Sequence, residues 1–105
     1  MSNFDDRFAS RIDKIYAMFG ESAIYKDSLD VLIDSDVTTI VEHNLQQYSE
    51  AGIDISGAVA VLKVRDSEVS DRPYRDHKFV IGTNIYNVEE VFVSDGVEHH
   101  MTVTE

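Results

Sequence analysis

The segment FVIGTNIYNVEEVFVSDGVEHHMTV, residues 79–103, has the clearest strand pattern in the chain. It contains three runs rich in valine, isoleucine and aromatic residues, and these runs are separated by Gly82-Thr83-Asn84 and Ser94-Asp95-Gly96. β-Branched and aromatic residues favour strands, and short polar connections that contain glycine favour hairpins. The stretch therefore predicts three consecutive antiparallel strands.

Upstream of this stretch the same pattern indicates further short strands. We predict them at residues 23–25, 29–33, 37–41 and 58–64, with Asp34-Ser35-Asp36 as the turn between the second and the third. The run at 58–64 is apolar enough to be buried on both faces, and its periodicity also leaves a short helix open.

The first segment has a different period, which predicts an amphipathic helix over about residues 4–19. Its large apolar residues recur mostly at steps of three and four: Phe4, Phe8, Ile12, Ile15, Tyr16 and Phe19. Ser2 or Asn3 can cap the start of the helix, and we expect Gly20 to end it in the left-handed conformation. A stripe of six large apolar side chains must lie on apolar surface, so the helix is a lid or an interface element.

One helix followed by six or seven short strands predicts an α+β chain that is mainly β. We expect an N-terminal helix and then a small antiparallel β-barrel, closed or half-open. A length of 105 residues fits a single domain, with the helix at about 4–19 and the barrel at about 22–104. Two long loops, residues 43–57 and 66–76, exceed what a minimal barrel needs, and connections of that length are usually functional or disordered.

The charge of the chain limits what it can bind. Nine Lys and Arg against twenty Asp and Glu give a formal net charge of -11. Such a chain repels a polyanion, so we expect no specific nucleic-acid binding. The sequence has no apolar run of the ~20 residues that a spanning helix needs, and its first residues lack the layout of a signal peptide. We therefore expect a soluble protein without a membrane partner.

No spacing in the sequence marks a catalytic, cofactor or metal site. The chain has no cysteine, its five glycines form no phosphate-binding loop, and its serines stand in no nucleophile elbow. The four histidines, His43, His77, His99 and His100, lack the spacing of metal ligands. We therefore expect no enzymatic activity; a metal-dependent hydrolase that uses loop aspartates and a histidine is the enzymatic alternative.

With no sign of a catalytic or metal site, binding to other proteins is the function that the sequence favours. The residues suited to it are concentrated in the two long loops. They contain Tyr48, Arg72, Tyr74 and Arg75, residue types that dominate the energetics of protein interfaces. Arg72 and Arg75 flank Pro73-Tyr74 and give a local positive spot that can bind carboxylates on a neighbour in a bidentate manner. The two tyrosines can equally pack on their own barrel.

The order of these features resembles that of a known family. The features are Met18-Phe19-Gly20 at the end of the helix, the strands Glu21–Tyr25 and Leu29–Asp34, an Arg72-Pro73 turn with Asp76, and then Phe79–Ile81, Ile85–Val91 and Asp95-Gly96. Over roughly residues 8–104 the chain resembles the small head-tail joining or head completion proteins of long-tailed bacteriophages, including the lambda type.

The resemblance implies a non-enzymatic virion component, found in the host cytoplasm during assembly and then at the head-tail neck. It implies a ring of copies that contacts the portal or adaptor protein, the tail proteins and neighbouring copies through the two long loops. The partner-binding residues expected there are Gln46, Gln47, Tyr48, Ile53, Arg72, Tyr74 and Arg75. An acidic channel wall would let DNA slide past. The alternatives are a tail completion protein of the same particle and an acidic DNA-mimic inhibitor.

Overall fold

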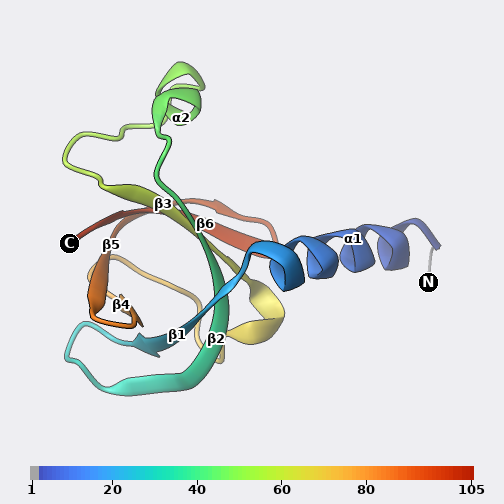
Figure 1. Cartoon of the computed structure of the whole chain (residues 1–105), viewed down its shortest axis with the longest axis horizontal. Coiled ribbons are helices and arrows are strands. Elements are labelled where there is room, and N and C mark those ends of the chain that lie inside the picture. Colours follow the sequence, from blue (N-terminus) through green and yellow to red (C-terminus); the bar gives the residue numbers. More distant parts are fainter. Residues whose placement is uncertain (1–2) are drawn as a thin grey trace.

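In a computed structural model, which describes residues 3–105 and the side chains of residues 11–105, one long helix leads into a six-stranded barrel (Figure 1). The helix, α1, spans Asn3–Phe19. The strands are β1 (Glu21–Lys26), β2 (Leu32–Glu42), β3 (Ala60–Arg65), β4 (Lys78–Ile81), β5 (Asn84–Ser94) and β6 (Glu98–Thr104). This architecture confirms the predicted fold class, which is mainly β with a helix near the N-terminus.

The sheet closes on itself in the order β1-β2-β3-β6-β5-β4, and every neighbouring pair is antiparallel. The closing pair, β1 with β4, is joined through Ile24↔Val80, Tyr25↔Phe79 and Lys26↔Lys78. Each strand therefore has a hydrogen-bonded neighbour on both sides. Closure removes the unpaired edges that an open sheet would offer to other strands.

Side chains from all six strands fill the barrel. They are Ala23, Tyr25, Val37, Ala60, Leu62, Val64, Phe79, Tyr86, Val88, Met101 and Val103. The rings of Tyr25 and Phe79 stack with their centroids 4.6 Å apart, which ties the two strands of the closing pair together. In β3 the adjacent residues Val61 and Leu62 are both fully buried, so the predicted burial on both faces is confirmed and the helical alternative for this run is wrong.

The parts of the two expected strands from Leu32 onward form one strand, β2, and the Asp34-Ser35-Asp36 turn between them is wrong. The start of the first expected strand is also wrong, because residues 29–31 lie in the β1–β2 connection, where Leu29 and Val31 are exposed. β2 runs through this triplet with an irregular register, because Tyr25 pairs with Asp34 whereas Ala23, two residues earlier, pairs with Val37, three residues later. A bulge accommodates the extra residue and bends the strand. The aspartate-rich triplet resembles a turn in sequence, but here it supplies the bend that a closed barrel requires.

The short connections agree with the sequence. β4 and β5 are joined by Gly82-Thr83, and β5 and β6 are joined by a turn in which Gly96 has a φ of 83°. The Asp95 carboxylate accepts hydrogen bonds from the N–H groups of Val97 and Glu98, both at 2.9 Å. These bonds hold the pKa of the Asp95 carboxyl below its usual value, so the charged side chain stabilises the turn.

Gly20 ends α1, but not in the predicted left-handed conformation, since the positive-φ glycines are Gly52, Gly57, Gly82 and Gly96. Its N–H donates to the Tyr16 carbonyl at 2.8 Å. A Cβ on Gly20 would lie 2.3 Å from both that carbonyl oxygen and Thr38 Cγ2. Glycine is therefore required by the close approach of α1 to β2. Of the expected caps, Ser2 and the side chain of Asn3 lie outside the described residues.

We predict that Gly20→Ala destabilises the protein by about 1–3 kcal/mol, because the added methyl group meets a backbone oxygen that cannot move by a change of rotamer. Urea denaturation measures this loss. Gly52→Ala is the matched control: no atom lies within 4 Å of its Cβ position, and the positive φ of 87° should be its main cost, roughly 1 kcal/mol. Wild-type stability in Gly20→Ala would contradict the argument.

Candidate functional site

The described part of the chain offers surfaces for contact with other molecules. Among its residues no group of three or more His, Asp or Glu side chains is placed to hold a metal ion. No helix in the same part of the chain has the length and apolar character needed to cross a membrane. The surfaces of interest are the candidate contact residues of the two long connections and the apolar residues along one groove.

The two long connections leave opposite ends of the barrel. Because all neighbouring strands are antiparallel, the connection at 43–59 between β2 and β3 lies at one end, and the connection at 66–77 between β3 and β4 lies at the other. The first carries the helix α2 (Gln46–Glu50), which stands away from the barrel, and the second begins with the 3-10 turn η1 (Asp66–Glu68) (Figure 1). We call these ends the α2 end and the η1 end.

At the α2 end, two of the expected residues point outward and two rest on the protein itself. Gln46 and Gln47 are exposed, and the Gln46 side chain bonds to Glu50 one turn later at 3.2 Å. The half-buried Tyr48 ring packs edge-on against Phe92 of β5, with the centroids 6.0 Å apart. Ile53 is also half-buried, and its N–H donates to the Tyr48 carbonyl at 3.0 Å.

At the η1 end, the expected residues form a small exposed cluster. The Tyr74 side chain is 59% exposed, and the Arg72 guanidinium carbon lies 5.9 Å from the centre of its ring. Arg75 forms an ion pair with Glu89 of β5 at 3.1 Å. Both partners of that pair are well exposed, so the pair contributes about 0–1 kcal/mol and can be exchanged for a carboxylate of another protein.

The η1-end connection is fastened to the barrel on both sides of this cluster. Ser70 donates from its N–H and its hydroxyl to the Asp34 carboxylate at 2.8 and 2.6 Å. The Tyr25 hydroxyl lies 2.8 Å from His77 Nδ1. Burial, with the charges of Asp71 and Asp34 adding to it, raises the pKa of the Tyr25 hydroxyl above its usual value. The hydroxyl therefore stays protonated, and it shares a hydrogen bond with His77 Nδ1.

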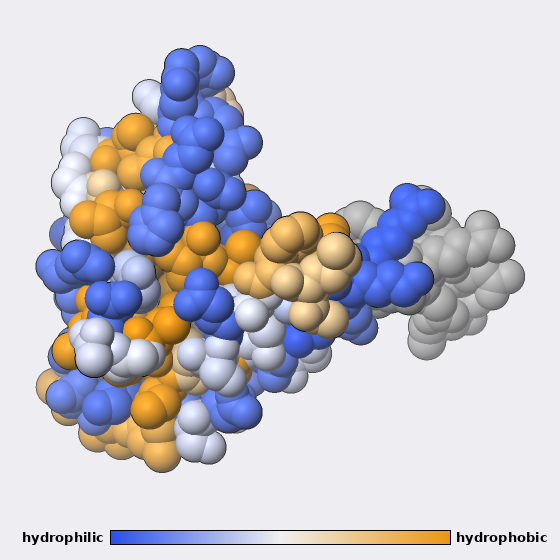
Figure 2. All heavy atoms as spheres, viewed as in Figure 1, coloured by the Kyte–Doolittle hydropathy of each residue, from blue (hydrophilic) through white to orange (hydrophobic). Residues whose placement is uncertain are grey.

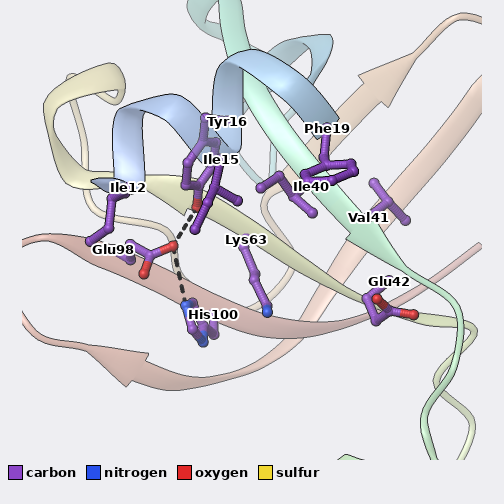
Figure 3. Close-up of a pocket in the computed structure, with 10 residues that line it drawn as sticks. All are labelled: Ile12, Ile15, Tyr16, Phe19, Ile40, Val41, Glu42, Lys63, Glu98 and His100. Atoms are coloured by element: carbon purple, nitrogen blue, oxygen red, sulfur yellow. Dashed lines mark hydrogen bonds and ion pairs between the residues drawn. The ribbon is translucent and has the colours of Figure 1, made fainter. Parts of the chain in front are cut away.

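A groove separates α1 from the outer face of β2, β3 and β6 (Figure 3). Its volume is about 520 Å³, and its lining is Ile12, Ile15, Tyr16, Phe19, Ile40, Val41, Glu42, Lys63, Glu98 and His100. On the helix side only Ile12 and Tyr16 are buried, whereas Ile15 is 48% exposed and Phe19 is 63% exposed. On its own barrel the stripe is therefore only partly buried, which leaves the expectation of a lid or an interface element open, and the side chains of Phe4 and Phe8 lie outside the described set.

Hydrogen bonds and a cation hold the helix beside the groove. The Tyr16 hydroxyl donates to Glu98 at 2.8 Å, and burial followed by this carboxylate raises the pKa of Tyr16 above its usual value. Arg65 lies under the Tyr16 ring, 4.8 Å from its centre, and pairs with Asp13 at 2.8 Å. Burial lowers the pKa of His100, which the nearby Glu98 opposes, so His100 on the groove floor favours its neutral form.

Sequence reasoning missed this groove because its floor comes from three strands. Ile40 of β2, Lys63 of β3 and His100 of β6 stand side by side only through the pairings Ile40↔Lys63 and Lys63↔His100. The available signal was on the helix, where Ile15 and Phe19 flank the buried stripe. In the sequence each of these residues looks like an ordinary strand or helix residue. The groove could be recognised only once the strand register was known.

We predict that Tyr25→Phe loosens the η1-end connection and leaves the barrel intact. The stacking on Phe79 is kept and the bond to His77 is lost, which should cost about 0.5–1.5 kcal/mol. Hydrogen exchange by mass spectrometry should show faster exchange in residues 66–77. Tyr86→Phe, a hydroxyl removal elsewhere in the same barrel, is the control and should leave that exchange unchanged. Equal exchange in Tyr25→Phe and wild type would show that this bond does not hold the connection.

One comparison with known proteins identifies the family of the chain. The family model for the Phage Head-Tail Attachment protein matches residues 4–104, which is nearly the whole chain. Searches of curated proteins and of solved structures returned no match. The matched region includes α1, all six strands and both long connections. The chain therefore belongs to the phage head-tail attachment protein family.

Proposed function

We propose that the protein is a non-enzymatic structural component of the virion neck, where copies of it form a ring between the portal and the tail. The observation that carries the proposal is the placement of the two long connections at opposite ends of one closed barrel. A protein that attaches a head to a tail must contact different partners on two sides. A rigid barrel with a different set of exposed side chains at each end suits that task.

At the α2 end the proposed contact residues are Gln46, Gln47, Tyr48 and Ile53. The half-buried Tyr48 and Ile53 fix the position of α2, and the exposed glutamines offer amide donors and acceptors to a partner. A small helix that stands away from the barrel can enter a recess on the portal, adaptor or tail side.

At the η1 end the proposed contact residues are Arg72, Tyr74 and Arg75. An exposed tyrosine beside two guanidinium groups is a composition enriched at the centres of protein interfaces. Bidentate binding of partner carboxylates by the two arginines would replace the weak pair between Arg75 and Glu89. The contact is therefore selective for an acidic surface on the adjoining virion protein.

The net charge fits a ring through which DNA passes. A charge of -11 on each copy repels the phosphate backbone, so a ring wall made of such copies would not retain the polymer. The same charge makes the copies repel one another in solution. Assembly in the host cytoplasm would then await the portal or tail, where many contacts act together.

We predict that Arg72→Glu/Arg75→Glu folds normally but no longer completes infectious particles, because both guanidinium contacts are lost and two repulsive charges are added. A complementation assay with a phage that lacks the protein measures the titre, and urea denaturation checks folding. Arg72→Lys/Arg75→Lys is the matched control: it keeps the charge and removes the bidentate geometry, so we expect a partial loss. A wild-type titre for the glutamate variant would exclude these residues from the contact.

We predict that the purified protein is a monomer at low salt and associates more strongly when the salt concentration is raised. The reason is that the Debye length shortens from about 10 Å at 0.1 M salt to about 3 Å at 1 M, which screens repulsion between the acidic copies. Sedimentation equilibrium at both salt concentrations measures the change. A stable ring at low salt and low protein concentration, without portal or tail, would contradict the proposed template-dependent assembly.

A further inference from the structure

We propose that the first turns of α1, residues 3–11, act as an arm that docks into the groove of a second copy of this chain. The inference rests on the proposed ring and names the contact that joins neighbouring copies. The groove is the one between α1 and the outer face of β2, β3 and β6. Each copy would thus give one arm and receive one.

The arm extends away from its own barrel. α1 has 17 residues, which corresponds to a length of about 25 Å, and its first turns run out from the barrel into open space (Figure 1). Among its described side chains only Ile12 and Tyr16 are buried. The sequence continues the apolar spacing of this stripe through Phe4 and Phe8. Helices in proteins owe most of their stability to packing of an amphipathic face, so a segment with phenylalanines at this spacing calls for an apolar surface to cover it.

The groove offers such a surface. Its wall is made of the exposed Ile15 and Phe19, and its floor includes Ile40. Apolar surface continues from the described part of α1 onto the barrel wall, shown in orange tones in Figure 2. In Figure 3 Phe19 lies beside Ile40, whereas Val41, which packs against the barrel core, lies on the other side of the β2 ribbon. Covering this surface removes apolar area from water, which favours binding.

The arm cannot fill the groove of its own chain. α1 is a single continuous helix, and its second half, from Ile12 to Phe19, already forms one wall of the groove. The first half continues the same axis outward, so its backbone moves away from the groove with every turn (Figure 1). The occupant must therefore come from another molecule.

Charge favours a second copy as that occupant. Lys63 lies on the groove floor, 5.8 Å from the centre of the Tyr48 ring, and within the part of the chain with described side chains it forms no ion pair. The arm sequence places Asp5 and Asp6 between its two phenylalanines.

The two carboxylates of the lining are already engaged by their own chain. Glu42 accepts a hydrogen bond from the Asn44 N–H at 3.0 Å, and Glu98 accepts one from Tyr16 at 2.8 Å. His100 favours its neutral form, so Lys63, which has no ion-pair partner among residues 11–105, is the charge on the floor that an acidic arm would meet.

Docking of an arm into a groove explains how an acidic chain could form a ring. Arm and groove are different surfaces of one molecule, so the contact is head-to-tail, and repetition of such a contact closes into a ring when the rotation permits. A helix of about three turns buries much less than the ~800 Å² per partner of a stable complex. The contact is therefore weak between free copies and gains strength on a template that holds many of them.

Chemical cross-linking tests the arm contact directly, because the chain has no cysteine. Two single-cysteine variants are prepared, Ala9→Cys in the arm and Glu42→Cys at the groove, and they are mixed during assembly and treated with a short bismaleimide. We expect a mixed dimer on denaturing gels of purified particles. Thr83→Cys, on the exposed β4–β5 turn, replaces the groove variant as the control and should give no mixed product.

Two further variants test the chemistry of the contact. Phe4→Ser/Phe8→Ser in the arm partner should reduce the mixed product several-fold, because the apolar side chains proposed to enter the groove are removed. Lys63→Glu in the groove partner should also reduce it, and Asp5→Lys/Asp6→Lys in the arm partner should restore it. Unchanged urea denaturation midpoints show that the fold is retained in each variant.

The outcomes separate the arm contact from the neck role. Variants that enter infectious particles without any mixed product would overturn the arm contact and leave the neck role standing. Cross-links of Ala9→Cys with itself, without the mixed product, would show an arm-to-arm contact and also overturn the inference. Absence of the protein from purified particles would overturn the neck role, and the arm contact with it.

Discussion

The pairing of β1 with β4 determines the shape of this protein. It turns a six-stranded sheet into a barrel, and the stacked rings of Tyr25 and Phe79 lie at this closing pair. Closure bends β2, β3 and β6, whose outer face forms the groove floor, and the antiparallel pairing around the barrel places the two long connections at opposite ends. An open sheet with the same strand order would lose the enclosed core and would offer two unpaired edges to other strands.

The sequence predicted those features that depend on neighbouring residues. Residues 79–103 were sufficient to predict three strands and two turns, because strand propensity and turn chemistry act over a few positions. Predictions from neighbouring residues were wrong where a contact with a residue distant in sequence determines the local conformation. Asp34-Ser35-Asp36 has the composition of a turn, but it is held within β2 by bonds to Ser22 and Ser70, which lie far away in sequence. The sequence suggested that Gly20 is a glycine because it adopts the left-handed conformation. The structure gives another reason, which is that a Cβ at this position would collide with Thr38 and with the Tyr16 carbonyl oxygen.

For the candidate surfaces too, the sequence predicted some features and the fold was needed for others. Tyr48, Arg72, Tyr74 and Arg75 could be selected from residue type and loop length alone, and their roles as contact residues stay a proposal. That Tyr48 rests on Phe92 while Tyr74 is exposed depends on the folding of each connection and could not be predicted. The groove required the strand register, because its floor residues come from three separate strands. Membership of the phage head-tail attachment protein family gives these surfaces a context in which contact with other proteins is the main activity.

Arg65 connects two of these surfaces through a single side chain. It stands at the end of β3, where it pairs with Asp13 of α1 at 2.8 Å and with Glu68 of η1 at 2.6 Å, and its cation lies beneath the Tyr16 ring. Any tilt of α1 must stretch or break one of these contacts, unless η1 moves with the helix. The helix and the connection that begins with η1 are therefore mechanically linked, so a force applied to the helix in a crowded assembly would be passed to the η1 end of the barrel.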